Sequence, residues 1–223
     1  MIQSILTRVK IQADSVGLKR LRQIKDDLRD AVAPFERNAE SCSTCKTPGA
    51  CCLDEHFVNV RISRLEAVAI ANVIARLPAI RRSAVEERIT HAAVNVSDAG
   101  GFACPLYENG TGCLVHTQAK PAPCVIHACY ERREDLPPDD LLDAAELSID
   151  RLNARVYGSS AELMPIPIAV RDAMRVDAEQ TPSPAPRAAI PRLDRSDHHG
   201  RIPTGIDTNS STVSAARSSR RGR

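Results

Sequence analysis

The stretch SCSTCKTPGACC, residues 41–52, places four cysteines within twelve residues of a chain that has 223 residues and eight cysteines in all. The other four follow in a segment rich in glycine and proline, after two expected helices. The two groups are Cys42, Cys45, Cys51 and Cys52, and then Cys104, Cys113, Cys124 and Cys129. Cysteines that only pack a core would be scattered among apolar helix positions, which these are not. The sequence therefore predicts two cysteine-rich loops that act together.

Metal binding is the chemistry that this pattern favours. Thiolates are soft anionic ligands, and sets of four suit Zn²⁺ or an iron–sulfur cluster. A Cys-x2-Cys step such as Cys42–Cys45 lets two sulfurs reach one ion from a tight turn. We predict that all eight cysteines are metal ligands. Structural disulfides, which seldom persist in a reducing cytosol, and scattered thiols remain the alternatives.

The choice between zinc and iron–sulfur stays open. Neighbouring side chains diverge, so we predict that Cys51 and Cys52 bind different metal atoms. A cysteine followed by proline, as at Cys104, also occurs in ferredoxin-type runs and favours an iron–sulfur cluster. Two closed tetrahedral zinc sites would instead use all eight thiolates. Three histidines close to the cysteines are alternative ligands, which we interpret as loop residues because eight thiolates suffice: His56, His116 and His127.

The order of these motifs resembles that of the YkgJ-type cysteine cluster proteins, whose shared region is described as a zinc- or iron-chelating domain. The similar elements are Cys42, Cys45 and Cys51–Cys52, followed by CPLY at 104–107, GCLVH at 112–116 and KPAPC at 120–124. The resemblance covers about residues 40–130 and implies a compact, mostly helical domain around the metal. The flagellin lysine N-methylases carry a similar cluster, but this chain lacks a glycine-rich strand-to-helix turn for a methyl-donor nucleotide.

Apolar residues at helical spacing surround the cysteine groups. They predict helices at 16–36, at 63–77, from 79 to about 97, and at 137–158. Ser63 and Glu66 form a predicted capping box, and HFVNV at 56–60 is a candidate strand. We therefore predict a mainly α fold: a small helical domain built around two cysteine-rich loops, with at most one or two short strands.

The chain divides by composition near residue 178. Residues 1–177 form the predicted cysteine-cluster metal-binding domain, with a core at about 40–130 flanked by packing helices. Residues 178–223 are rich in proline, serine and arginine without periodicity, which predicts a disordered tail. This tail carries eight arginines and four acidic residues and is therefore basic.

Several function classes are disfavoured. The longest apolar run, at 67–75, is far shorter than the roughly 20 residues that span a bilayer, and no signal peptide is recognisable, so we predict a cytoplasmic protein without a membrane partner. An aromatic content of 3% provides few stacking platforms for nucleic acid. Metal ions are the expected partners, and a protein partner is left open.

The sequence therefore predicts a metal-binding protein that holds zinc or an iron–sulfur cluster, with no assigned catalytic residue. One alternative is an iron–sulfur-dependent enzyme related to protein lysine N-methylases, with Asp54, Glu55 and His116 near an open metal. The other is a zinc-stabilised interaction adaptor, whose arginine-rich end at 217–223 would bind phosphate groups.

Overall fold

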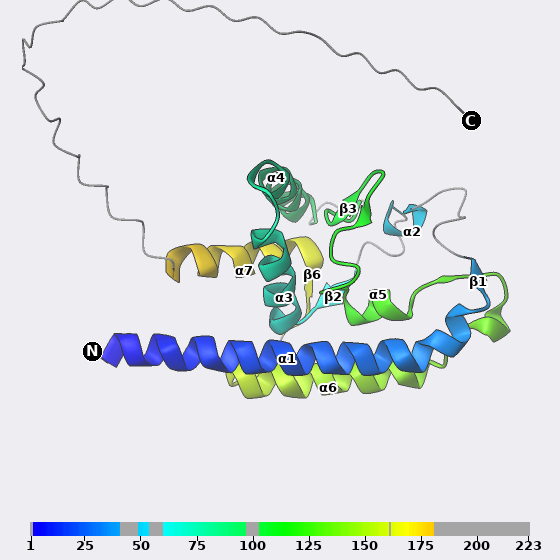
Figure 1. Cartoon of the computed structure of the whole chain (residues 1–223), viewed down its shortest axis with the longest axis horizontal. Helices are drawn as coiled ribbons and strands as arrows, with labels where there is room; N and C mark the ends of the chain where they lie inside the picture. Colours follow the sequence, from blue (N-terminus) through cyan, green and yellow to red (C-terminus); the bar gives the residue numbers. More distant parts are fainter. Residues whose placement is uncertain (1, 41–48, 54–59, 97–102, 161, 181–223) are drawn as a thin grey trace, which may run out of the picture. The chain divides into compact units, whose positions relative to one another are not determined.

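A computed structural model describes residues 2–40, 49–53, 60–96, 103–160 and 162–180. Helices predominate in these residues, which confirms the mainly α prediction (Figure 1). The helices are α1 (Ile2–Glu36), α2 (Ala50–Leu53), α3 (Arg64–Ala75), α4 (Ala79–Asn95), α5 (Ala122–Ile126), α6 (Asp139–Tyr157) and α7 (Ile166–Gln180), with one 3-10 turn at Arg133–Asp135.

The strands are six two-residue segments: β1 (Ala39–Glu40), β2 (Arg61–Ile62), β3 (Tyr107–Glu108), β4 (Gly112–Cys113), β5 (Cys129–Tyr130) and β6 (Met164–Pro165). They form three antiparallel pairs, β1–β5, β2–β6 and β3–β4, in the described part of the chain. The number of short strands therefore exceeds the one or two that the sequence predicts. Two of the pairs, β1–β5 and β2–β6, join segments that are far apart in the sequence, and β3–β4 forms a short hairpin. The predicted strand at 56–60 lies outside the described residues except for Val60.

The four predicted helices all exist, and their ends agree closely with the sequence signals. Ser63 caps α3 as predicted, because its Oγ accepts a hydrogen bond from the Glu66 amide at 3.3 Å. The Glu66 carboxylate completes the capping box by accepting from the Ser63 amide at 3.2 Å. Gly158 ends α6 with φ +82°, a conformation that glycine adopts without strain. The first helix differs most, because α1 begins at Ile2 rather than near residue 16.

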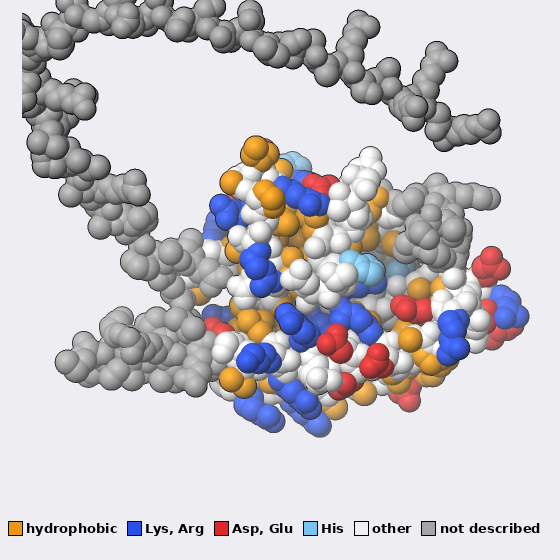
Figure 2. All heavy atoms as spheres, in the orientation of Figure 1, with side chains coloured by type: hydrophobic (Ala, Val, Ile, Leu, Met, Phe, Trp, Pro, Cys, Tyr) orange, Lys and Arg blue, Asp and Glu red, His pale blue; other side chains and the backbone are white. Residues whose placement is uncertain are grey.

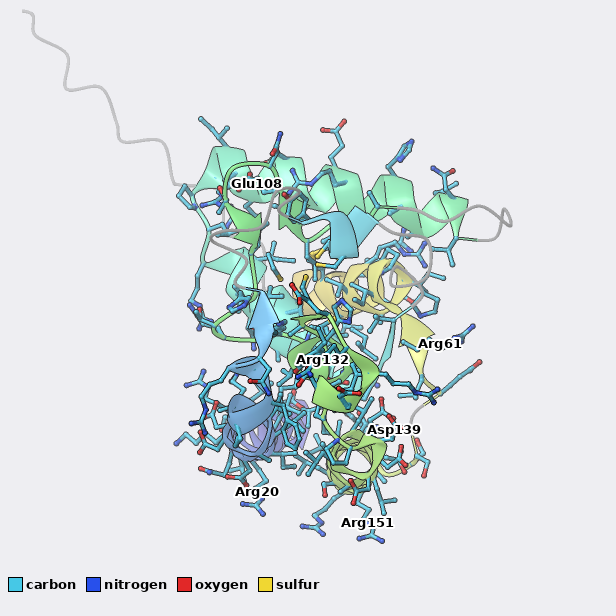
Figure 3. All side chains as sticks on the ribbon, turned by 90° about the vertical axis from the view of Figure 1, so that its right-hand side faces the viewer. Arg20, Arg61, Glu108, Arg132, Asp139 and Arg151 are labelled. Atoms are coloured by element: carbon cyan, nitrogen blue, oxygen red, sulfur yellow. The ribbon has the colours of Figure 1, made fainter. Side chains whose placement is uncertain are left out.

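Helices α1 and α6 lie side by side, as Figures 1 and 3 show from two directions. The apolar stripe predicted on α1 is buried here at Leu21, Leu28 and Val32, in one core cluster with residues of α6 such as Ile149. The two helices approach closely at Gly17, where an added Cβ would lie 2.8 Å from a side-chain carbon of Val156. Gly17 lies in the first half of α1 and Val156 lies at the end of α6, so the two helices run antiparallel.

A second core cluster joins α3, α4 and α7. Ile70 and Ile74 of α3, Val85 and Ile89 of α4 and Val170 of α7 are its central buried residues. The chain reaches α7 through β6, which pairs with β2 just before α3. A two-residue strand therefore leads directly into a helix of 15 residues.

A buried ion pair links the helices that carry these clusters. Lys25 Nζ of α1 lies 2.9 Å from Glu66 Oε1 of α3, and the two side chains are only 3% and 4% exposed. The same carboxylate oxygen accepts a hydrogen bond of 3.2 Å from the Ala122 amide at the start of α5. Glu66 therefore caps its own helix and also fixes α1 and α5 against it.

The boundary of the predicted tail lies slightly later than expected. Helix α7 continues to Gln180, and the compact unit that contains this helix is Met1–Pro182. The second unit, Ser183–Arg223, lies outside the described residues, so its disorder stays a prediction. Among the helices of the described residues, none combines the length and the apolar character that crossing a membrane requires. The cytoplasmic location stays a prediction.

Candidate metal centre

Six of the eight predicted ligands lie in the described residues. Cys51 and Cys52 are on α2, Cys104 precedes β3, Cys113 is in β4, Cys124 is in α5 and Cys129 is in β5. Cys42 and Cys45 lie outside the described residues, as do Asp54, Glu55 and His56.

The two cysteine groups are joined through the backbone. The Cys104 amide donates a hydrogen bond of 2.9 Å to the carbonyl oxygen of Cys52. Gly49 directly precedes α2, and its carbonyl oxygen accepts a hydrogen bond from the Cys52 amide at 2.8 Å. Gly49 has φ +83°, and an added Cβ would lie 2.0 Å from the ring of Tyr107. Tyr107 therefore packs directly on the backbone that presents the Cys51–Cys52 pair, a position that only glycine allows.

The hairpin of β3 and β4 returns the chain from Cys104 to Cys113. The Tyr107 amide bonds to the Cys104 carbonyl oxygen at 3.0 Å, and Tyr107 then faces Cys113 across the strand pair. Leu106 and Val115 on either side of this hairpin are 1% and 0% exposed, so the core holds both of its arms.

The hairpin is also fixed to α4. Arg81 of α4 binds the carboxylate of Glu108 through two nitrogens, with its Nε at 2.8 Å from Oε2. Figure 3 shows Glu108 close to α4. In addition, Arg88 Nε donates to the Pro105 carbonyl oxygen at 3.2 Å. The turn after Cys104 is thus held from one side by two arginines of the same helix.

Cys124 is positioned by the buried ion pair described above. Its helix, α5, starts at Ala122, whose amide binds Glu66, and both Ala122 and Val125 are buried in the core cluster of α1 and α6. Because α5 is fixed in this way, Cys124 lies near Cys104 and Cys113, whose charges act on its thiol.

Burial dominates the ionisation of these thiols. It raises the pKa of Cys104 to about 11 and that of Cys124 to about 12. Burial also raises the pKa of Cys52 and Cys113, and for Cys52 the neighbouring Cys51, Cys104 and Cys113 add to the increase. Cys51, Cys52, Cys104 and Cys113 therefore lie within electrostatic reach of one another, and Cys124 lies within reach of Cys104 and Cys113. Without a cation among them Cys52, Cys104, Cys113 and Cys124 are neutral thiols, whereas a bound metal ion would favour their thiolate forms.

These five cysteines are not joined in disulfides. A hydrogen bond with the Cys51 side chain contributes to the raised pKa of Cys52, so the adjacent side chains touch rather than diverge. In the part of the chain that the structure describes, no three side chains of His, Cys, Asp or Glu are arranged to ligate one ion. The structure thus gathers thiols from four segments without forming a complete coordination sphere from the described residues alone.

Cys129 occupies a different position, which the sequence pattern did not reveal. It lies in β5 opposite Glu40 of β1, and Glu40 is the last described residue before the segment that holds Cys42 and Cys45. The pairing of β1 with β5 therefore brings the last cysteine of the second group beside the strand that leads into the first group.

Two further residues near the thiols carry relevant charge properties. Burial lowers the pKa of His116, with help from Lys120 and Arg29, so its imidazole is neutral near pH 7 and able to bind a metal. The charge of Lys120 opposes part of the increase that burial causes in the pKa of Cys113 and Cys124. Sequence reasoning noted Lys120 only within the KPAPC motif and missed its role as a cation beside two thiols. His127 is the residue that ends α5.

The chain matches no family model, no curated protein and no solved structure. The resemblance to the YkgJ-type cysteine cluster proteins therefore stays a prediction based on the motifs. What the fold and the site define is a class: a mainly α protein in which short helices and a hairpin gather cysteine thiols from two distant parts of the sequence.

Proposed function

We propose that this chain is a metal-binding protein that holds zinc or an iron–sulfur cluster through its cysteines. The observation that supports the proposal most is the hydrogen bond between the Cys104 amide and the Cys52 carbonyl oxygen, which joins the two groups. Around that bond, five thiols from four segments form a connected group, in which each thiol lies within electrostatic reach of at least two others. Such a gathering of partly buried thiols provides soft ligands for a metal.

The donor set fits such a metal in two respects. Cys51, Cys52, Cys104, Cys113 and Cys124 are only partly exposed, so bound metal would be shielded from competing water. Lys120 lies where it offsets part of the negative charge that several thiolates would accumulate. When bound, the metal would cross-link α2, the β3–β4 hairpin and α5 and would supply either structural rigidity or an electron carrier.

Metal uptake by this site would release protons. Because burial raises the pKa of Cys104 and Cys124, these thiols hold their protons in the metal-free protein at pH 7. A metal must displace them, so its apparent affinity is expected to increase with pH. The ligand set would be completed by cysteines outside the described residues. The prediction that Cys51 and Cys52 bind different metal atoms loses its argument from diverging side chains, because these two side chains touch.

The test is an absorption spectrum with metal and sulfide analysis of full-length protein purified without oxygen. Coloured protein that contains iron and sulfide would support the cluster, and colourless protein with about two zinc ions per chain would support two tetrahedral sites. The variant Cys104→Ser is expected to lose bound metal, while Ser83→Ala on the exposed side of α4 should retain it. Folded, metal-free protein with four disulfides would refute the proposal.

The enzyme alternative rests on His116 together with Asp54 and Glu55, which lie outside the described part of the chain, and the adaptor alternative rests on the basic end at 217–223, which also lies outside it. No reaction or partner is therefore assigned to the metal centre.

A further inference from the structure

A small cavity of about 90 Å³ lies between α1, α3 and the segment that follows β4. Its described lining combines polar and apolar side chains from these three parts of the chain: Leu18, Leu21, Arg22, Lys25, Ala69, Asn72, Val73, Arg76, Gln118 and Ala119. On the face drawn in Figure 2, several Lys and Arg side chains lie over the described part of α1 and above it toward α3, with Asp and Glu side chains beside them. The cavity is separate from the cysteines described above, none of which lines it.

The polar groups of this lining are hydrogen-bond donors. Arg22, Lys25 and Arg76 are cations, and Asn72 and Gln118 carry amide groups. Of the described residues that line the cavity, none is aspartate or glutamate. An excess of donors over acceptors around an enclosed space favours an anion as its occupant.

Lys25 gives the strongest indication that an acceptor belongs in this cavity. Its side chain is 3% exposed, and an ammonium group has three donors. Nζ lies 2.9 Å from Glu66 Oε1, which accounts for one of these three donors, and no hydrogen bond from Nζ to another described residue is present. Buried donors are nearly always satisfied by protein, water or ligand. Since Lys25 lines the cavity, an acceptor placed there would satisfy it.

The rim of the cavity is arranged to contribute further donors. Arg76 Nη2 donates to Gln118 Oε1 at 2.9 Å, which occupies the oxygen of that amide and leaves its NH₂ group as a donor. Arg22, Arg76 and Gln118 are exposed, so the cavity opens to solvent between them. Leu21, Val73 and Ala119 are buried and form apolar walls.

We propose that this cavity is a binding site for a small oxyanion of the phosphate type. Glu66 already balances the charge of Lys25, so Arg22 and Arg76 provide the net positive charge and Lys25 provides donors at the floor. The volume accommodates several water molecules or one small oxyanion, and arginine forks suit its oxygens. The site does not depend on the metal-binding function, because its residues are not metal ligands.

The test is a calorimetric titration of the full chain with inorganic phosphate, in chloride buffer at constant ionic strength. We expect saturable binding that weakens about tenfold in Arg22→Gln and in Arg76→Gln, since each removes a charged donor. The matched control is Arg82→Gln, which removes an exposed arginine of α4 that does not line the cavity and should bind as the wild type does. Far-ultraviolet circular dichroism confirms that each variant is folded.

A second titration with glycerol phosphate distinguishes the source of the oxyanion. Stronger binding than that of inorganic phosphate would assign the cavity to the phosphate group of a larger molecule, and weaker binding would assign it to the free anion. The proposal is overturned if phosphate does not bind saturably. It is equally overturned if Arg22→Gln and Arg76→Gln bind phosphate as tightly as Arg82→Gln does, because the anion would then lie elsewhere, for example on bound metal.

Discussion

The substitution Lys25→Met removes one half of the buried ion pair between α1 and α3 while it keeps most of the side-chain volume. Glu66, whose side chain is 4% exposed, would then keep its negative charge without a cation beside it. Breaking a buried pair in this way costs about 3–5 kcal/mol of the free energy of unfolding. The carboxylate retains hydrogen bonds from the Ser63 amide, the Ser63 hydroxyl and the Ala122 amide. We therefore expect a loss near the lower end, about 3 kcal/mol.

Urea unfolding followed by far-ultraviolet circular dichroism measures this loss, with all variants brought to the same metal content. With an m-value of about 2 kcal/mol per molar urea, the midpoint should fall by about 1.5 M. The matched control is Glu86→Gln, which breaks the exposed pair of Arg82 and Glu86, whose closest atoms are 3.9 Å apart. Exposed pairs contribute less than about 1 kcal/mol, so that midpoint should hardly change.

The double variant Lys25→Met with Glu66→Gln tests the same reasoning from the other side. Removing both charges leaves no buried ion unpaired, so the double variant should be less destabilised than the sum of the two single variants. If Lys25→Met lowers the midpoint no more than Glu86→Gln does, the pair does not hold α1 against α3 and the reasoning fails.

Three further predictions concern the metal centre. Gly49→Ala should reduce both stability and metal content, because the added Cβ would lie 2.0 Å from the Tyr107 ring. The control Gly110→Ala has φ +75° but open space around it, so it should cost only about 1 kcal/mol of stability and retain the metal. Equal metal content in the two variants would contradict the packing argument. Burial raises the pKa of Cys104 to about 11 and that of Cys124 to about 12. The contribution of these two thiols to the stability of the metal-free protein is therefore complete below the ordinary thiol pKa and is lost as the pH rises through the raised pKa values. Urea midpoints measured between pH 7 and pH 10 should show the beginning of this decline. Removing the metal with a chelator should lower the urea midpoint at pH 7, and an unchanged midpoint would show that the metal does not stabilise the fold.

The helices were predictable because their signals are local. Leu21, Leu28 and Val32 recur at helical spacing and are buried, and the Ser63–Glu66 capping box forms as its sequence indicates. The three strand pairs were not predictable in the same way. Each strand has two residues, which is too short for an alternating pattern, and β1–β5 and β2–β6 join segments about ninety to one hundred residues apart.

For the candidate metal centre, the sequence determined the ligand types and their two groups, because cysteine spacing is local and its chemistry is intrinsic. Only the tertiary structure decided how the groups meet: Cys104 binds the backbone of Cys52, and Tyr107 packs on Gly49. Glu66 shows the same division within one residue. Its role as a helix cap follows from a serine three positions earlier, but its contacts with Lys25 and Ala122 arise only when three helices pack together, since burial and long-range charge pairing have no local sequence pattern.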